Sequence, residues 1–572
     1  MDKGLISTAT ATATARRGIL LDLLTALSRS HGLACAALVA LSLLMFLPGF
    51  TGLPPMDRDE PRFAQASKQM LETGNFVLIR FQDEARNKKP VGIYWLQSAS
   101  VALAESTGFG SARATIWLYR IPSLIGAIAA VLLTYWAGLT WLENRYAFMA
   151  AALMCASILL GVEARLAKTD AVLTASIVAA MGALARLFAM RDAKVKGSAA
   201  PSFVLWLAIA VGVLIKGPIV VMVAGLASLA LSIKERSGRW LKPACDYRAI
   251  ALALIIIAPW FIAIALDTHG AFFSEAVGGD MLGRVAGARE AHGAPPGTYL
   301  VAAFITSWPI APLALIAAPA IWRARREDAV AFLLAWLIPS WLVFEAVPTK
   351  LPHYVLPLYP AIALLVALIA QRGDLRAEGR WRRLALILLP LPAALVALAI
   401  PYVTLLYGDR ADIVGALFAA LATSCAVVAA IALTRRRIEQ ACSMLLMAAL
   451  LLFIGIYGFA IPRLQALTLS PRLVALMSKS PCVPQALATA GFNEPSLVFL
   501  TRTDLHLTNG ADAARFLALP GCRAAFVDIR QEGEFTKGLA AIGRTPNLLG
   551  RVLGVNLNGG RHMDIGVYAN GG

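Results

Sequence analysis

Charged side chains crowd one stretch of the sequence, residues 56–97, which follows the first apolar block. Acidic residues come first and basic residues follow: Asp57, Asp59 and Glu60, then Arg80, Arg86, Lys88 and Lys89. A carboxylate at the end of a membrane span can act as a general base that takes a proton from an attacking hydroxyl. Lysine and arginine side chains bind phosphate well. The stretch therefore combines residues for proton abstraction with residues for holding an anion.

Asp59 is the candidate base, and Asp170 is a second acidic residue. Each of them either acts on the substrate or caps the helix that it begins. Asp59 begins the segment DEPRFAQASKQML, whose paired acids and early proline also suit the capped start of a helix. Asp170 precedes AVLTASIVAAM and either orients a substrate or caps that helix. The two roles are compatible, because a helix N-terminus also positions its carboxylate.

Basic residues recur later in the chain. We expect Arg86, Lys88, Lys89, Lys216 and Lys350 to converge on one side of the membrane, without enough acids to neutralise them. Any one of them could instead extend to anionic lipid headgroups. That alternative fits Lys216 and Lys350 less well, because each lies beside a proline-containing break, KGP and KLP. Such a break frees backbone amides that an anionic ligand would satisfy.

The composition indicates what kind of protein holds these residues. The chain of 572 residues is 59% hydrophobic and 15% charged, with a mean hydropathy of +0.69. Apolar blocks of about 17–25 residues, long enough to cross a bilayer as helices, recur along it. A net charge of +18 would suggest nucleic-acid binding in a soluble protein. Here Lys and Arg concentrate in short loops between the blocks, as positive-inside topology requires. The sequence predicts a polytopic α-helical membrane protein that contacts membrane lipids and no nucleic acid.

The apolar blocks predict about thirteen transmembrane helices within residues 32–461. A further block, 91–108, is short and carries Gln97 and Glu105. Counting it as a span would move four basic loops to the outside, against the positive-inside rule. We therefore predict that it is a juxtamembrane helix in the interface. The resulting topology has a cytoplasmic tail at 1–31, an external juxtamembrane segment at 51–112 and an external C-terminus.

Two other external segments are predicted. The glycine-rich loop 267–297 contains Asp280, Arg284 and His292, and it either closes over a substrate or holds a metal, with Asp280 and His292 as the candidate ligands. Residues 462–572 alternate β-type runs (PSLVFL, AAFVDI, MDIGVYA) with helix-like segments, which predicts a small α/β domain. Its two cysteines, Cys482 and Cys522, form a disulfide in an oxidising compartment or are two buried thiols.

Taken in order, the charged motifs resemble those of a known family. DEPRFAQASKQMLETGNF, NKKPVGIYWLQ, RLAKTDAVLTA, IKGP and KLPHYVLPLYPAIALL, within roughly residues 32–370, resemble the lipid-linked-sugar glycosyltransferases. The likeness is to the 4-amino-4-deoxy-arabinose lipid A transferases, the rhizobial galacturonosyltransferases and the protein O-mannosyltransferases. It implies the C-type glycosyltransferase fold in the bacterial inner membrane, a periplasmic active site, an undecaprenyl-phosphate sugar donor and an inverting transfer.

The resemblance also implies roles for single residues. Asp59 would be the catalytic base and Asp170 the second acid of the site. The donor phosphate would be held by basic residues: Lys89, Lys216 and Arg284, with Lys88 and Arg86 beside them. Further substrate contacts would come from five positions: Glu60, Arg62, Lys350, His353 and Tyr354.

The chain departs from the family pattern at Lys88. The aminoarabinose transferases usually read Glu-Lys-Pro where this chain reads Lys88-Lys89-Pro90, and that Glu is associated with a bound metal together with histidines of the later loop. We therefore expect no resident cofactor, with a divalent metal as the alternative. The same departure leaves the donor sugar open.

The function expected from the sequence is transfer of a sugar from undecaprenyl phosphate to lipid A, lipopolysaccharide or another envelope acceptor, by a monomer. One alternative keeps the fold but transfers to protein side chains or moves a whole oligosaccharide. The other is a transporter or flippase for lipid-linked sugars. A transporter is disfavoured because no inverted repeat is visible and the charges gather on one side instead of at the membrane midplane.

Overall fold

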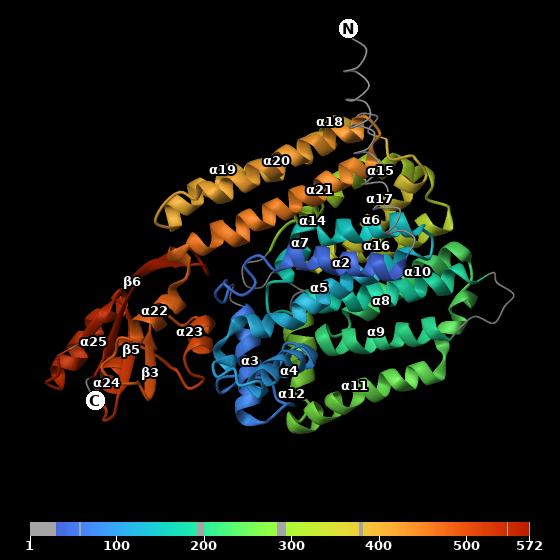
Figure 1. Cartoon of the computed structure of the whole chain (residues 1–572). Coiled ribbons are helices and arrows are strands. Elements are labelled where there is room, and N and C mark those ends of the chain that lie inside the picture. The colour runs from blue at the N-terminus through green and yellow to red at the C-terminus, as the bar shows by residue number, and fades with distance from the viewer. Residues whose placement is uncertain are drawn as a thin grey trace, which may run out of the picture.

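The protein is a bundle of long helices with a small mixed β-sheet at one end (Figure 1). The computed structural model describes residues 30–56, 59–191, 199–282, 293–376, 381–545 and 547–570. The predicted cytoplasmic tail therefore lies outside the described residues, except for Ser30 and His31.

The helices follow the predicted apolar blocks. In the first part of the chain they are α2 (His31–Phe46), α3 (Asp59–Thr73), α4 (Gly92–Ser106), α5 (Ile116–Gly138), α6 (Asn144–Cys155), α7 (Ile158–Glu163), α8 (Asp170–Ala189), α9 (Ala200–Lys216), α10 (Ile219–Glu235), α11 (Tyr247–Asp267) and α12 (Ala271–Phe273). The later ones are α14 (Thr298–Thr306), α15 (Ile310–Arg323), α16 (Asp328–Ala346), α17 (Tyr359–Gln371), α18 (Arg382–Leu388), α19 (Leu391–Tyr407), α20 (Ile413–Thr434) and α21 (Ile438–Phe453). Apolar segments in lipid become helical because a helix satisfies its own backbone polar groups.

Helix length and composition give a smaller number of spans than the apolar blocks predict. Within the described residues, eight helices are long and apolar enough to cross a membrane. The pair α14–α15 would make a ninth span, although its two halves meet at 117°. Helices α2 and α9 are apolar but shorter. The mostly helical, multi-pass fold is confirmed, and the number thirteen is not.

Ion pairs join loops at the end of the bundle that lies away from the sheet. Arg191 and Lys234 both contact Asp328, at 2.6 and 3.2 Å. Arg145 contacts Glu439 at 2.7 Å, and further residues of the basic loops lie nearby in sequence. The basic loops therefore share one end of the bundle, which is the arrangement that the charge bias predicts.

Helix α4 does not run along the bundle. Near its start, Gly92 lies against the backbone of Leu214 at the end of α9. Further along, Ser100 Oγ donates to the carbonyl oxygen of Leu118, close to the start of α5. Both contacts are at the same end of the bundle, so the segment 91–108 turns across that end, as predicted. The half-exposed Trp95 donates its indole N–H to the carbonyl oxygen of Phe76.

The C-terminal region forms a five-stranded sheet flanked by helices. Its elements are α22 (Leu469–Met477), β3 (Ala486–Ala490), α23 (Pro495–Leu500), β4 (His506–Thr508), α24 (Gly510–Ala518), β5 (Arg523–Asp528), α25 (Ile529–Ala541), β6 (Leu548–Asn556) and β7 (Arg561–Ala569). The strand order is β4-β3-β5-β7-β6, with β3 parallel to β4 and β5 and with β7 antiparallel to both its neighbours.

One predicted strand of this region is wrong. The run PSLVFL is helix α23, with Pro495 in its first turn, where a proline fits well. Its apolar residues Leu497, Val498 and Phe499 are buried, and the Phe499 ring packs edge-on against Tyr119 of α5. Burial against the helical bundle therefore outweighs the β-propensity of this short run. The runs AAFVDI and MDIGVYA fall on β5 and β7, as predicted.

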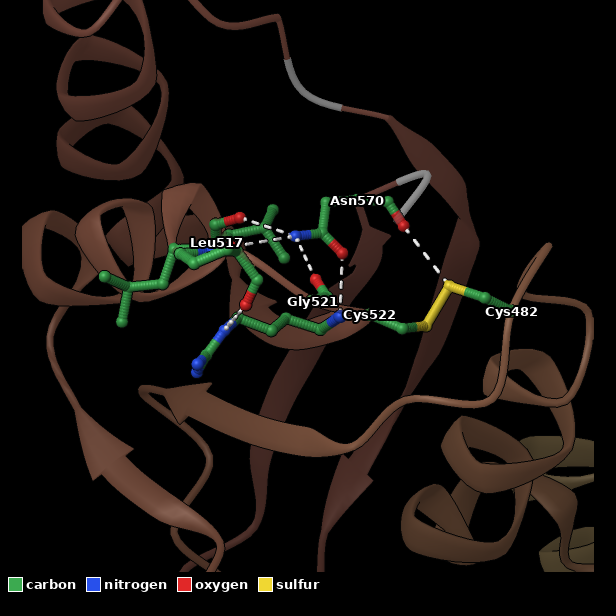
Figure 2. The surroundings of a disulfide bond; sticks show 8 residues. Cys482, Leu517, Gly521, Cys522 and Asn570 are labelled. Atoms are coloured by element: carbon green, nitrogen blue, oxygen red, sulfur yellow. Dashed lines mark hydrogen bonds between the residues drawn. A yellow bond between two sulfur atoms is a disulfide. The ribbon is translucent and has the colours of Figure 1, made fainter.

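The two cysteines of this region form a disulfide, Cys482–Cys522 (Figure 2). It lies beside Asn570, whose side-chain amide donates to the carbonyl oxygens of Leu517 and Gly521 at 3.0 and 2.9 Å. The Asn570 side chain also accepts from the backbone N–H of Arg523. These contacts tie the end of β7 to the loop that precedes β5.

The C-terminal region docks on α3 and on the short hairpin β1 (Arg80–Phe81) and β2 (Glu84–Ala85). The buried Lys68 ammonium donates to the carbonyl oxygen of Phe499 at 3.0 Å. The Gln82 side chain donates to the carbonyl oxygens of Thr503 and Leu505 at 3.0 and 2.8 Å. The charged stretch that the sequence singles out therefore lies between the bundle and the sheet (Figure 1).

Candidate active site

A cavity of about 260 Å³ lies at the sheet end of the bundle. Most of the residues predicted for the site line it: Asp59, Arg62, Arg86, Lys88, Lys89, Asp170, Lys216, His353 and Tyr354. They come from segments that are far apart in the sequence, namely α3, the segment after β2, and the ends of α8, α9 and the loop before α17. The structure thus brings together what the motifs only suggested.

Asp59 lies at the first position of α3 and is accessible from the cavity. Its carboxylate is 3.7 Å from the Arg62 guanidinium, and about half of its side-chain surface (48%) is exposed. The helix N-terminus favours the charged carboxylate at this position. Asp59 is therefore a carboxylate that an acceptor hydroxyl can reach, as a general base requires.

Two aromatic side chains, Phe63 and Tyr94, contact the Arg86 side chain and hold it in place. Its guanidinium lies 5.0 Å from the centre of the Phe63 ring, and its Nε–H donates to the Tyr94 hydroxyl at 3.4 Å. Burial raises the pKa of the Tyr94 phenol, so this partner stays neutral. Arg86 therefore offers a positioned positive charge to the cavity.

Asp170 and Lys216 form a buried ion pair in the wall of the cavity. Asp170 is the first residue of α8 and Lys216 the last of α9. Helix α9 ends there because Gly217 adopts φ +71°, which favours glycine, and Pro218 then precedes α10. The Lys216 ammonium also lies 5.3 Å from the centre of the Tyr354 ring. The KGP break thus serves to place a lysine inside the site.

The cavity is strongly cationic. Its lining includes two carboxylates, Asp59 and Asp170. It also includes six basic side chains: Arg62, Arg86, Lys88, Lys89, Lys168 and Lys216. Since one carboxylate is already paired with Lys216, the remaining excess of positive charge suits a phosphate group.

Glu60 does not line the cavity with the other predicted site residues. Its side chain is fully buried and forms a two-pronged ion pair with Arg120 of α5, at 2.7 and 3.0 Å. It also accepts from the backbone N–H groups of Met56 and Ala167. Glu60 therefore joins the start of α3 to the bundle. Of the two adjacent acidic residues, Asp59 is the one whose carboxylate is accessible.

Lys350 likewise does not line the cavity, and its contacts are with the protein backbone. The buried ammonium donates to the carbonyl oxygens of Glu345 and Val347, at 2.6 and 2.5 Å. These are carbonyl groups at the end of α16, which have no partner within the helix. Within the KLP motif, therefore, a lysine satisfies the freed backbone groups, and no anionic ligand is needed for that purpose.

The candidates from the loop 267–297 have no described geometry. Arg284 and His292 lie outside the described residues, and so does the side chain of Asp280. The phosphate contact of Arg284 and the metal role of the other two stay predictions.

Among the described residues, one group has the composition of a metal site: Glu163, Asp170 and His353, whose ligand atoms lie within 4.8 Å of one another. His353 is 3.8 Å from the Glu163 carboxylate and 4.0 Å from that of Asp170. The Asp170 carboxylate, however, is already bonded to the Lys216 ammonium. A divalent cation would compete with that ammonium for the Asp170 carboxylate, and a metal at this group stays a prediction.

Two buried arginines, Arg120 and Arg165, lie beside the site and were not among the predicted site residues. Arg120 donates to the carbonyl oxygens of Leu53 and Pro54, both at 2.8 Å, besides its pair with Glu60. Arg165 donates to carbonyl oxygens at the end of α2 and in α7, and its guanidinium lies 4.0 Å from the Tyr457 ring centre. The sequence alone could have indicated a role for both arginines, because an ionisable residue at membrane depth needs a partner. Its consequence here is structural, since these arginines hold the chain where it leaves the membrane.

Comparison with known proteins gives matches in sequence. The dolichyl-phosphate-mannose-protein mannosyltransferase family matches residues 88–262. Two undecaprenyl phosphate-alpha-4-amino-4-deoxy-L-arabinose arabinosyl transferases, from Erwinia tasmaniensis and Pseudomonas fluorescens, are 30% identical over 319 and 315 residues. The matched part is 54% of this chain and 54% of each relative, so the likeness spans about half the length of these curated relatives.

Comparison with solved structures gives a match in fold. ArnT from Cupriavidus metallidurans, bound to undecaprenyl phosphate, superimposes with a TM-score of 0.71 over 93% of this chain and 97% of that chain, at 18% identity. The apo form of the same protein gives 0.70 at 17% identity. The fold is therefore shared over nearly the whole length, the C-terminal region included. The resemblance seen in the motifs is confirmed: the chain is similar in sequence to the aminoarabinose transferases over about half its length, and it shares the fold of ArnT.

Proposed function

We propose that the protein is a membrane glycosyltransferase that moves a sugar from undecaprenyl phosphate to an envelope acceptor such as lipid A or lipopolysaccharide. The observation that carries the proposal is the cavity in which an accessible carboxylate, Asp59, faces an excess of lysine and arginine. The matched arabinosyl transferases are named for undecaprenyl phosphate donors, and the ArnT structure holds undecaprenyl phosphate.

The proposed reaction is a direct displacement at the anomeric carbon of the donor sugar. Asp59 accepts the proton of an acceptor hydroxyl while the acceptor oxygen forms a bond to the anomeric carbon. The bond from that carbon to the phosphate oxygen breaks, and its electron pair leaves with undecaprenyl phosphate. Lys89, Lys216 and Arg86 stabilise the negative charge that develops on the phosphate. No acid is required, because a phosphate leaves readily as an anion.

The proposed topology completes the predicted thirteen crossings. The shorter helices α2, α9 and α10, and the pair α6–α7, would cross besides the longer helices. The N-terminus would be cytoplasmic, and the cavity and the C-terminal region would lie on the periplasmic side of the inner membrane. The chain would act as a monomer.

The first test is the variant Asp59→Asn. It removes the base without changing the size of the side chain, so sugar transfer should fall by about a hundredfold or more. Undecaprenyl phosphate should still bind and stabilise the purified variant, because the basic residues are untouched. The measurement is mass spectrometry of envelope glycolipids from a deletion strain that expresses either form, with thermal unfolding in detergent to follow donor-lipid binding.

The matched control is Asp83→Asn, an exposed aspartate in the β1–β2 turn that does not line the cavity. It should transfer sugar at the wild-type rate. Wild-type turnover by Asp59→Asn would rule out its role as the base. Absence of any glycolipid change on deletion of the gene would instead favour a transporter or a protein acceptor.

A further inference from the structure

A second cavity, of about 500 Å³, adjoins the first and shares Asp59 and Arg62 with it. Its remaining wall comes mainly from the C-terminal region: the approach to α22, the segment around Glu494, and the tip of the hairpin between β6 and β7. The candidate base therefore lies at the junction of two cavities, one built by the membrane helices and one closed by the C-terminal sheet.

Polar side chains of the C-terminal region are held in place along this second wall. The Asn556 amide donates to Glu494 Oε1 at 2.8 Å, and the Asn556 side-chain oxygen accepts from the backbone N–H of Asn558 at 2.9 Å. The Ser470 and Ser496 hydroxyls are hydrogen-bonded to each other at 2.8 Å. Amides, hydroxyls and one carboxylate that are fixed in this way form an ordered polar surface with both donors and acceptors.

The two cavities differ sharply in charge. The first has six basic side chains against two carboxylates. The second has one basic side chain, Arg62, against two carboxylates, Asp59 and Glu494. A phosphate group in the second cavity would face a net negative wall, and like charges at short range repel. Hydroxyl groups, in contrast, can hydrogen-bond to carboxylates, to amides and to serine side chains.

We propose that the second cavity is the acceptor subsite, and that it takes the uncharged, hydroxyl-rich sugar portion of an envelope glycolipid. The proposal rests on the proposed function and specifies its acceptor. The volume of the second cavity is in the range of cavities that hold small ligands. The donors and acceptors in its wall suit several hydroxyls on one sugar ring. A single serine or threonine hydroxyl of a protein would engage few of these groups.

Asp59 and Arg62 line both cavities, and their position sets the direction in which the sugar is transferred. An acceptor hydroxyl in the second cavity loses its proton to Asp59 and its oxygen bonds to the anomeric carbon. The phosphate leaves on the side of the first cavity, with the electron pair of the broken bond. The product is an O-glycoside, in which the new bond joins sugar carbon to hydroxyl oxygen. Attack by a phosphate oxygen would instead give a glycosyl phosphodiester.

The linkage of the product tests the proposal without any variant. Envelope glycolipids are extracted from a deletion strain and from the same strain expressing the wild-type chain, and the added sugar is found by mass difference. We expect the sugar to resist mild acid and to add no phosphodiester signal to the ³¹P NMR spectrum of the glycolipid. An acid-labile sugar carried on a phosphodiester, or a sugar recovered only on protein, would overturn the proposal.

A cavity-filling variant tests the location. Asn558→Trp places a bulky side chain at the hairpin tip, which is exposed and accommodates a change. The amount of product should fall by about tenfold or more, while undecaprenyl phosphate still stabilises the purified protein. The matched control is Asn547→Trp, at an exposed asparagine of the same region that does not line the cavity. It should behave as the wild type.

The outcomes separate this proposal from the proposed function. Wild-type product levels from Asn558→Trp would overturn the acceptor subsite and leave sugar transfer intact. If the wild-type chain adds no sugar to any glycolipid, and Asp59→Asn changes nothing, both proposals fail together. A loss of undecaprenyl phosphate binding in Asn558→Trp would also contradict the assignment, because it would place the donor in the second cavity.

Discussion

Two neighbouring carboxylates at the start of α3, Asp59 and Glu60, have opposite surroundings. One is half exposed in the cationic cavity, and the other is fully buried against Arg120. A buried pair that loses one partner leaves an uncompensated charge, which costs more than the pair contributes. At the scale of single residues, one of two adjacent acids is accessible from the cavity and the other is part of a buried ion pair.

Glu60→Gln should lower the stability of the protein by about 3 kcal/mol, because Arg120 would remain charged and buried. Its yield and its melting temperature in detergent should fall, while the folded fraction keeps the wild-type KM for the donor. Glu105→Gln is the control, since it breaks a partly exposed pair with Arg113, which should cost less than about 1 kcal/mol. A normal melting temperature combined with lost transfer would assign Glu60 to the substrate after all.

At the scale of secondary-structure elements, Arg551 of β6 links the strands β6 and β7 to helix α25. It donates to Glu532 at 2.8 and 2.9 Å and to Asp564 at 2.7 Å, and the Tyr568 hydroxyl bonds to Glu532 as well. The hydrogen bonds from Arg551 lower the pKa of the Glu532 carboxyl below its ordinary value. This cluster stiffens the hairpin whose tip closes the second cavity.

The stability that Glu532 contributes should depend on pH. A carboxyl with a lower pKa in the folded than in the unfolded state stabilises the protein above its ordinary pKa, and that contribution is lost as the pH falls through the folded value. Glu532→Gln should therefore destabilise the region by about 1 kcal/mol at neutral pH, and much less in acid. Hydrogen exchange of β6 and β7 measures this. Glu534→Gln, an exposed neighbour on α25, should show no such difference at either pH.

At the scale of the whole molecule, the disulfide reports on the side of the membrane that the C-terminal region occupies. Disulfides persist in oxidising compartments such as the periplasm. Replacing Cys482 and Cys522 together by serine should lower the stability of the region by about 2–4 kcal/mol, as seen by faster limited proteolysis. Cys245→Ser, at an exposed free cysteine, is the control. Alkylation of both cysteines without a reductant would contradict the bridge and the periplasmic assignment.

The sequence predicts residues that line the cavity where these residues lie at breaks between apolar blocks. Asp59, Lys89, Asp170 and Lys216 were recognisable, because an ionisable residue beside lipid needs a reason to be there. The sequence does not indicate which residues these charged side chains pair with. Nothing near Glu60 in the sequence indicates that its partner is Arg120, far along the chain. Likewise, PSLVFL became a helix because of the bundle that it packs against.

The common wall of Asp59 and Arg62 has a kinetic consequence. Under the proposed assignment each substrate would have its own cavity, so the acceptor would enter without waiting for undecaprenyl phosphate to depart. The sugar passes from one to the other in a single event, and no residue of the protein carries it in between. The two substrates then form a ternary complex with the protein, and the rate of each turnover depends on both concentrations at once.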